Sequence, residues 1–178
     1  MTDPRSFNRV ERLRDGTPVT VRAVRPDDKD RIVAAFRALE PASIYARFFQ
    51  HKNALSEQEL RGATELDFEN DVALVVTLGQ GDQEIIIGGA RYSLYQDRNG
   101  QRNAEIAFTV EEDYHGQGIA GLLLQLLIPI ARERGIRRFT ADVLAENAAM
   151  LAVFSRCGLP MATESHPDGI QVSLDLRD

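Results

Sequence analysis

The feature that most constrains the fold is a glycine-rich turn that joins a strand-like segment to a long helical segment. Residues 105–110 have the composition of a strand, and residues 116–134 repeat apolar side chains at helical spacing, with glycine at 116, 118 and 121. Glycine lets backbone N–H groups approach a ligand closely, and the first turn of a helix presents unpaired N–H groups and the positive end of its dipole. This order of elements predicts either a purely structural turn or a seat for a phosphate.

Length and composition indicate an ordinary globular protein of one domain. The chain has 178 residues, of which 43% are hydrophobic and 27% are charged, and these are the proportions of soluble domains. No apolar run approaches the ~20 residues that cross a bilayer, and the first residues, MTDPRSFNRV, lack the apolar core of a signal peptide. We therefore expect a cytoplasmic protein that does not enter a membrane.

Charge and cysteine content argue against two further classes of partner. The net charge is −6 at pH 7, which disfavours a nucleic acid as the main partner. Cys157 is the single cysteine, so we expect neither an intramolecular disulfide nor a metal site. Acidic residues gather at 65–71 and 111–113, either as solvated loops or as a negative field that draws a cationic substrate such as lysine.

The order of the expected elements implies a single domain at residues 16–178, preceded by a flexible polar segment at residues 1–15. Three successive strands joined by short turns predict an antiparallel meander, and the strand–helix–strand unit that follows predicts parallel pairing. The expected strands cover residues 18–24, 72–78, 84–95, 102–110, 137–143 and 171–176. The expected helices follow Pro26, carry Phe48 and Phe49, begin after Ser56 with Glu59 at the capping-box position, and cover residues 116–134 and 147–156.

In this order of elements the chain resembles the GNAT family of acyl-CoA-dependent N-acyltransferases, over about residues 16–176. The family's turn, Gln/Arg-x-x-Gly-x-Gly/Ala, corresponds to HGQGIA at residues 115–120, which departs from it at His115. The resemblance is closer to the GNAT domain of bacterial Pat-type protein lysine acetyltransferases, in the segments DGTPVTVRAVRPDD, PASIYARFFQ, AEIAFTVEEDYHGQGIAGLLL and ADVLAENAAM. It implies an α/β (α+β) fold of GNAT type, with a mixed, mostly antiparallel central sheet flanked by helices.

The resemblance also implies that the chain binds acetyl-CoA as a co-substrate. The pyrophosphate is expected on the amides of the glycine turn, the pantetheine arm along the strand that precedes it, and the thioester carbonyl at the N–H of Val110. Asn147 is expected to contact the pantetheine, to cap the helix that it begins, or to do both. The residues assigned to acetyl-CoA are Phe108, Thr109, Val110, His115, Gly116, Gln117, Gly118, Ile119, Ala120, Gly121 and Asn147.

Glu105 is the candidate catalytic residue. The side chain of lysine has a pKa of ~10.4, so a base must take its proton during attack. Glu105, in AEIAFTV, matches the glutamate assigned as that base in Pat-type enzymes; the alternative is an ordinary solvent-facing glutamate. Phe154 stands where many GNAT enzymes carry a tyrosine that protonates the departing thiolate. The general acid is therefore left open between water and Tyr114.

The acceptor is the least constrained part of the interpretation. The resemblance implies a lysine of a protein substrate, such as an AMP-forming acyl-CoA synthetase. The alternatives are a small-molecule amine or amino acid, and a non-catalytic module that binds acyl-CoA. Arg47, in the PASIYARFFQ segment, either reaches the substrate cleft or closes a salt bridge.

Overall fold

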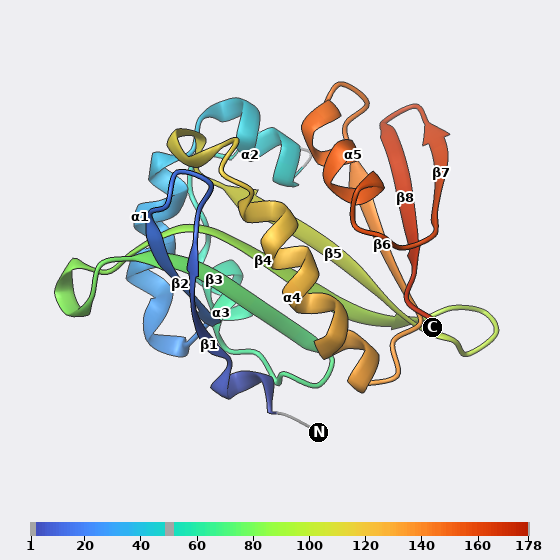
Figure 1. Ribbon diagram of the computed structural model, residues 1–178, viewed down its shortest axis with the longest axis horizontal. Helices are drawn as coiled ribbons and strands as arrows, with labels where there is room; N and C mark the ends of the chain where they lie inside the picture. Colours follow the sequence, from blue (N-terminus) through green and yellow to red (C-terminus); the bar gives the residue numbers. More distant parts are fainter. Residues whose placement is uncertain (1–2, 49–51, 178) are drawn as a thin grey trace.

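The computed structural model describes residues 3–48 and 52–177, which form a central sheet with helices on both faces (Figure 1). The strands are β1 (Asn8–Arg12), β2 (Pro18–Ala23), β3 (Asp71–Leu78), β4 (Ile85–Gln96), β5 (Arg102–Val110), β6 (Arg138–Val143), β7 (Met161–His166) and β8 (Gly169–Asp175). The helices are α1 (Lys29–Ala38), α2 (Pro41–Phe48), α3 (Glu57–Thr64), α4 (Ile119–Glu133) and α5 (Ala148–Ser155), with short 3-10 turns at Pro4–Ser6, Pro26–Asp28, Gly81–Gln83 and Glu112–Tyr114. None of the described helices is long and apolar enough to cross a membrane.

The sheet has the mixed, mostly antiparallel arrangement that the sequence predicts. Its strand order is β1-β2-β3-β4-β5-β6-β8-β7. The meander β3-β4-β5 is antiparallel throughout, and β6 runs parallel to β5. A parallel pair needs a crossover connection, and α4 supplies it. The expected fold class is therefore confirmed.

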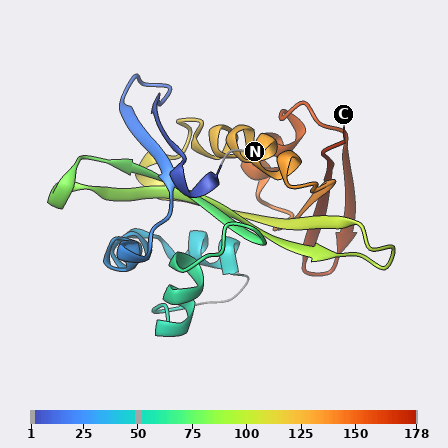
Figure 2. The same ribbon diagram turned by 90° about the horizontal axis from the view of Figure 1, so that it is seen from below.

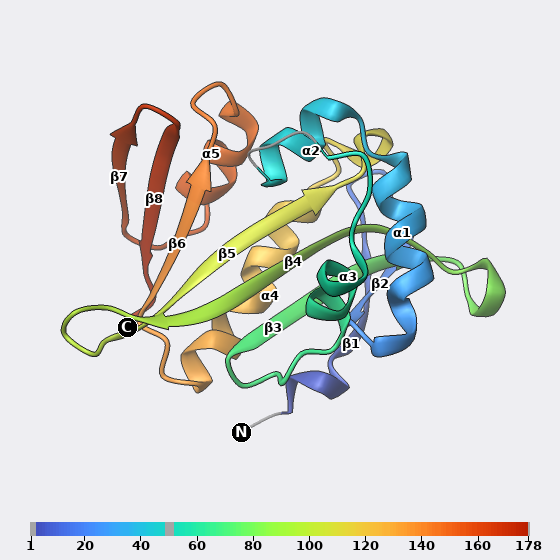
Figure 3. The ribbon, with the colours of Figure 1, turned by 180° about the vertical axis from the view of Figure 1, so that it is seen from behind.

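The helices divide between the two faces of the sheet (Figures 2 and 3). In Figure 2, α4 and α5 lie above the sheet, and α1, α2 and α3 lie below it. The helix α4 has an apolar stripe against the sheet because Leu123, Leu127 and Ala131 recur at helical spacing, and all three have no solvent exposure. A glycine with a left-handed backbone, Gly135 (φ 74°), follows the helix.

The face that carries α1–α3 is fixed partly by buried charges. The Arg22 guanidinium on β2 donates to both carboxylate oxygens of Asp28 at 2.8 Å, and Asp28 also accepts from the backbone N–H of Arg25 at 2.7 Å. Asp28 is fully buried, and burial alone raises a carboxyl pKa; these hydrogen bonds outweigh it and lower the pKa of Asp28. Since Asp28 immediately precedes α1, the pair attaches this helix to the sheet.

The capping box at the start of α3 is also confirmed. The Ser56 hydroxyl accepts from the backbone N–H of Glu59 at 3.0 Å, and the Glu59 carboxylate accepts from the backbone N–H of Ser56 at 3.1 Å. The expected contribution of Phe49 to the preceding helix lies outside the described residues.

Two strands were not predicted, and they lie at the two edges of the sheet. The strand β1 falls in the segment that was expected to be flexible, yet it pairs with β2 in register from Asn8↔Arg22 to Arg12↔Pro18. The strand β7 pairs with β8 at the other edge. Most side chains of β1 and β7 are exposed, so neither strand shows the alternation of apolar residues on which strand prediction depends.

Candidate active site

The candidate site begins where two neighbouring strands separate. The parallel pairing of β5 and β6 covers only Asn103–Glu105 against Arg138–Thr140, although both strands continue beyond it. Past Glu105, the edge of β5 that faces β6 is therefore left without a neighbouring strand. A cleft of about 280 Å³ opens there, between β5, the turn that precedes α4, and the start of α5.

Most of the residues assigned to acetyl-CoA line this cleft. The lining members of the set are Phe108, Thr109, Val110, His115, Gly116, Gly118, Ile119, Ala120 and Asn147. Gln117 and Gly121 instead line an adjacent cavity of about 420 Å³, which residues 12–14 also line. The predicted cofactor residues thus come together at one end of the sheet, from three separate segments of the chain.

The glycine turn has a backbone geometry that favours glycine. Gly116 and Gly118 have φ angles of 80° and 85°, in the left-handed region that favours glycine. Gly118 is the N-cap of α4 and brings no side chain to cap the helix. The first N–H groups of α4 therefore need an acceptor from outside the helix, at the positive end of its dipole.

Arg14, which the sequence interpretation missed, supports this turn from the loop between β1 and β2. Its guanidinium donates to the carbonyl oxygen of Gly116 at 3.0 Å, and its backbone N–H donates to the carbonyl oxygen of Gln117 at 3.3 Å. Arg14 also lines the cleft, so it places a positive charge beside the candidate phosphate seat. No local pattern marks it, because it lies about a hundred residues from the turn in the sequence.

His115, which departs from the family pattern, stabilises the turn through a side-chain hydrogen bond. Its Nε2 atom lies 2.9 Å from the carbonyl oxygen of Val110. A carbonyl oxygen only accepts, so Nε2 carries the proton and donates it. His115 thereby holds the turn against the end of β5.

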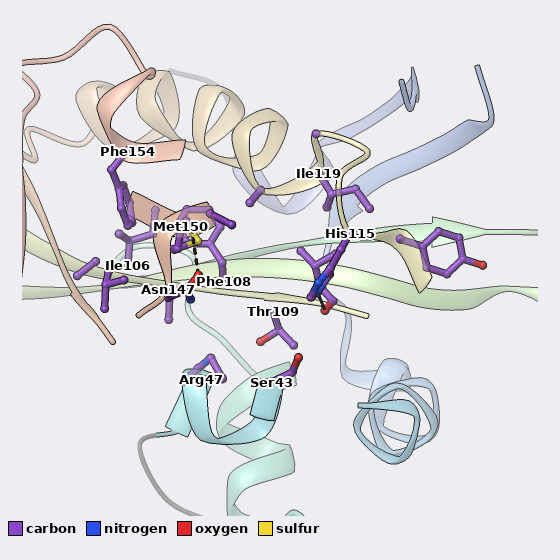
Figure 4. A pocket seen from close by; sticks show the side chains of 18 of the residues that line it. Ser43, Arg47, Ile106, Phe108, Thr109, His115, Ile119, Asn147, Met150 and Phe154 are labelled. Atoms are coloured by element: carbon purple, nitrogen blue, oxygen red, sulfur yellow. Dashed lines mark hydrogen bonds between the residues drawn. The ribbon is translucent and has the colours of Figure 1, made fainter. Parts of the chain in front are cut away.

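Asn147 and Phe154 form the α5 side of the cleft, and Figure 4 shows Phe154 on this side together with Met150. The Asn147 side-chain oxygen accepts from the backbone N–H of Met150 at 3.2 Å, so the expected N-cap is present. Its side-chain NH₂ group is not used in that bond. Phe154 is buried and packs edge-on against Phe108, with ring centroids 5.8 Å apart. Phe154 has no proton to donate, and Tyr114, the other candidate donor, lines the cleft as well.

Glu105 lies at the point where β5 and β6 separate, on the face of the sheet that carries α1–α3. It pairs with Ser93 on β4 and with Thr140 on β6, and its side chain is exposed. Strand alternation puts Glu105, Ala107 and Thr109 on this same face. Glu105 is not among the residues that line the cleft.

Asp142 is a second carboxylate in this region that the sequence interpretation did not single out. It lies on β6, two residues beyond Thr140, and therefore on the same face as Glu105. Its side chain is exposed, and it lines the cleft. This face of the sheet therefore carries two exposed carboxylates beside the point where β5 and β6 separate.

A larger cavity of about 400 Å³ lies on that face, between the sheet and α1–α3. Its walls are mainly apolar, with Ile32, Phe36 and Leu39 from the segment of α1. It shares Arg47, Ala107 and Thr109 with the cleft, so the two cavities meet beside β5. Within residues 3–48 and 52–177, no cluster of histidine, cysteine and carboxylate side chains could hold a metal ion.

Comparison with known proteins identifies relatives over most of the chain. Residues 35–159 match the model of the acetyltransferase (GNAT) family. An acetyltransferase of Pseudomonas aeruginosa is 30% identical over 159 residues, which cover 89% of this chain and 83% of that protein. The crystal structure of the GNAT domain of S. lividans PAT superposes with a TM-score of 0.84 at 32% identity, over 94% of this chain and 96% of that domain.

A third relative is a longer protein. Acetyltransferase Pat of Mycolicibacterium smegmatis is 32% identical over 146 residues, which cover 82% of this chain. The match spans only 42% of the length of that protein.

Proposed function

The chain belongs to the acetyltransferase (GNAT) family of acetyl-CoA-dependent N-acetyltransferases, and we propose that it acetylates a lysine amine of a protein substrate. The observation that carries the proposal is the junction at Glu105, where β5 and β6 separate. At this junction a cleft that is lined from both faces of the sheet leads to the free amides of α4, and Glu105 is exposed beside it, where a large acceptor has access.

The cleft has the parts that acetyl-CoA needs. The amides at the start of α4 offer hydrogen bonds to the pyrophosphate, and the Arg14 guanidinium adds a positive charge next to them. The free edge of β5 at Phe108–Val110 offers backbone hydrogen-bonding groups. The pantetheine arm can bind along this edge in the way that an added strand pairs with the edge of a sheet. The unused NH₂ group of Asn147 is a further donor to that arm.

The chemistry is direct attack of the lysine amine on the thioester. Glu105 accepts the proton of the amine, a role that contributes about 100-fold to 10,000-fold in rate. The N–H of Val110 donates to the carbonyl oxygen as negative charge develops on it. The nitrogen–carbon bond forms as the carbon–sulfur bond breaks, and the departing thiolate takes a proton from water or from Tyr114.

Two features support a protein as the acceptor. Glu105 and Asp142 are exposed on the same face, where they attract a cationic side chain presented on the surface of another protein. The relatives also include proteins called Pat. The cavity of about 400 Å³ favours a second candidate, a small-molecule amine whose apolar part fills it.

The test is turnover of a lysine-bearing acceptor by the wild-type chain and by Glu105→Gln, followed as release of free thiol from acetyl-CoA. An AMP-forming acyl-CoA synthetase is the first acceptor to try. We expect Glu105→Gln to lower kcat by at least about 100-fold and to leave the affinity for acetyl-CoA unchanged. Glu164→Gln is the matched control, because Glu164 is an exposed strand glutamate on β7.

Three results would contradict parts of this proposal. A full rate with Glu105→Gln would show that Glu105 is not the general base. Turnover of small amines alone would replace the protein acceptor with the second candidate. Tight binding of acetyl-CoA without turnover of any amine would favour a non-catalytic module.

A further inference from the structure

Arg47 occupies the place where the cleft and the apolar cavity meet. It lies in the last turn of α2, which packs against β5, and its side chain lines both spaces. Figure 4 shows Arg47 and Ser43 on the α2 side of the strand, with Met150 and Phe154 on the opposite side. His115 and Ile119, which mark the phosphate end of the cleft, lie farther along the strand than Arg47. Arg47 is therefore at the acyl end.

The guanidinium of Arg47 has no carboxylate partner among the described residues. Its recorded contact is with an aromatic ring: the guanidinium carbon lies 4.8 Å from the ring centroid of Phe48. Other arginines on this face do have carboxylate partners, such as Arg22 with Asp28 at 2.8 Å and Arg91 with Asp71 at 3.2 Å. Of the two alternatives for Arg47, the salt bridge is thus not formed within the described part of the chain, and the residue lines the cleft instead.

This environment leaves a positive charge only partly compensated. Burial lowers the pKa of Arg47, the nearby Arg91 guanidinium lowers it further, and the Glu105 carboxylate acts in the opposite direction. A half-buried charge that has lost water without gaining a partner raises the free energy of the protein, and an anionic ligand would reverse that cost.

The anion that fits this position must arrive with the acceptor. The acetyl thioester at this end of the cleft is neutral, and the phosphates of acetyl-CoA belong at the α4 end, beside Arg14. On the acceptor side, Glu105 and Asp142 complement an amine. A molecule that carries both an amine and a carboxylate matches this arrangement of charges.

We propose that Arg47 binds a carboxylate of the acceptor and so determines which amines are acetylated. This proposal rests on the proposed function: in a protein substrate, the carboxylate belongs to an acidic side chain beside the target lysine. The planar guanidinium of arginine is suited to this role because it donates two parallel hydrogen bonds to a carboxylate. The contact with the carboxylate orients the amine toward Glu105. Arg47 does not itself touch the reacting atoms, so it is a positioning residue.

The test compares two peptides that differ only beside the lysine, one with glutamate and one with glutamine. We expect the wild-type chain to prefer the glutamate peptide by about 10-fold to 100-fold in kcat/KM, the range for a hydrogen bond to a charged group. Arg47→Gln should bring this ratio close to one, mainly through a higher KM for the glutamate peptide. Arg47→Lys should keep part of the preference, and Arg37→Gln, at an exposed position on α1, should keep all of it.

A second pair of acceptors separates this proposal from the proposed function. Nα-acetyl-lysine and its amide carry the same ε-amine and differ in the free carboxylate. If neither peptide is acetylated but this pair shows a preference that Arg47→Gln removes, the protein acceptor is wrong and the role of Arg47 stands. An equal loss on both members of a pair with Arg47→Gln would overturn the role. No wild-type preference in either pair, or no turnover of any of the four acceptors, would overturn it as well.

Discussion

The part of α4 that lies over the central sheet is packed with fully buried side chains, whereas α1–α3 leave a cavity of about 400 Å³ against the other face. The cavity of about 420 Å³ beside α4 lies at its N-terminal half, against residues 12–14. Leu123, Leu124 and Leu127 on α4 are completely buried. On the other face, Ile32 and Leu39 line the cavity and are only half-buried. A close-packed interior resists change, while an open one accommodates a ligand.

This difference in packing agrees with our proposal that the two faces bind different substrates. The α4 face bears the cofactor end, where backbone N–H groups of one turn make the site and need a rigid frame. The α1–α3 face bears the acceptor end, where charged side chains such as Arg47 and Glu105 make the site. The predictions below test this contrast, in order of decreasing effect on stability.

The largest effect is expected for the buried ion pair that attaches α1. Asp28→Asn should lower the free energy of unfolding at pH 7 by up to about 3–5 kcal/mol, because it removes the fully buried carboxylate partner of Arg22 and leaves Glu84, at 3.2 Å, as the remaining one. The control is Asp27→Asn, since the Asp27 side chain is 71% exposed and a surface pair contributes about 0–1 kcal/mol. Urea unfolding of the three proteins measures the difference.

The same pair predicts the pH dependence of stability. The pKa of Asp28 is lower in the folded state than its ordinary value of 3.8, so the unfolded state binds the proton first as pH falls. The contribution is complete above about pH 4 and is lost as pH falls through the folded-state pKa. The wild type and Asp28→Asn should therefore converge in stability in acid. A gap that stays constant down to the acid transition would contradict the assignment.

The two faces should differ in their response to truncation. Leu127→Ala should cost about 3–4 kcal/mol, as for a fully buried leucine that leaves a new cavity. Leu39→Ala should cost about 1–2 kcal/mol, because its side chain is half-buried and already borders a cavity. Equal losses in thermal or urea unfolding would show that the faces are packed alike.

Backbone strain at the glycine turn should weaken acetyl-CoA binding, whereas the same strain at a distant glycine should lower stability only. Gly118→Ala and Gly100→Ala both place a side chain at a positive φ, 85° and 76°, and each should cost about 1–2 kcal/mol. Only at Gly118 does the added Cβ approach another group, at 3.3 Å from Arg14 Nε. We expect about 10-fold weaker acetyl-CoA binding by calorimetry for Gly118→Ala. Equal affinities of the two variants for acetyl-CoA would show that the turn is not part of the binding site.

The smallest change in stability is expected on filling the acceptor cavity. Ala63→Leu on α3 extends into the cavity and should change the free energy of unfolding by less than about 1 kcal/mol, since the space is present. It should nevertheless raise the KM of the acceptor and leave the KM of acetyl-CoA unchanged. Ala34→Leu, at an exposed position on α1, is the control. An unchanged KM for the acceptor would show that the acceptor does not bind in this cavity.

The parts of the molecule that the sequence predicted are those that depend on local patterns. The glycine turn at the start of a helix, the apolar stripe of α4 and the capping box at Ser56 each follow from a few neighbouring residues. The edge strands β1 and β7 escaped prediction because their exposed side chains show no such pattern.

The sequence by itself determined the glycine turn at the start of α4, where we propose that the phosphates of acetyl-CoA bind, because a phosphate seat made from backbone amides requires only a glycine turn at a helix start. Only the tertiary structure decided where β5 and β6 separate and what stands around that point. Arg14, Arg47 and Asp142 come from different segments, and their proximity results from packing across the sheet. Side chains that meet across long sequence separations leave no periodicity or spacing in the chain, so the acceptor end became visible only in three dimensions.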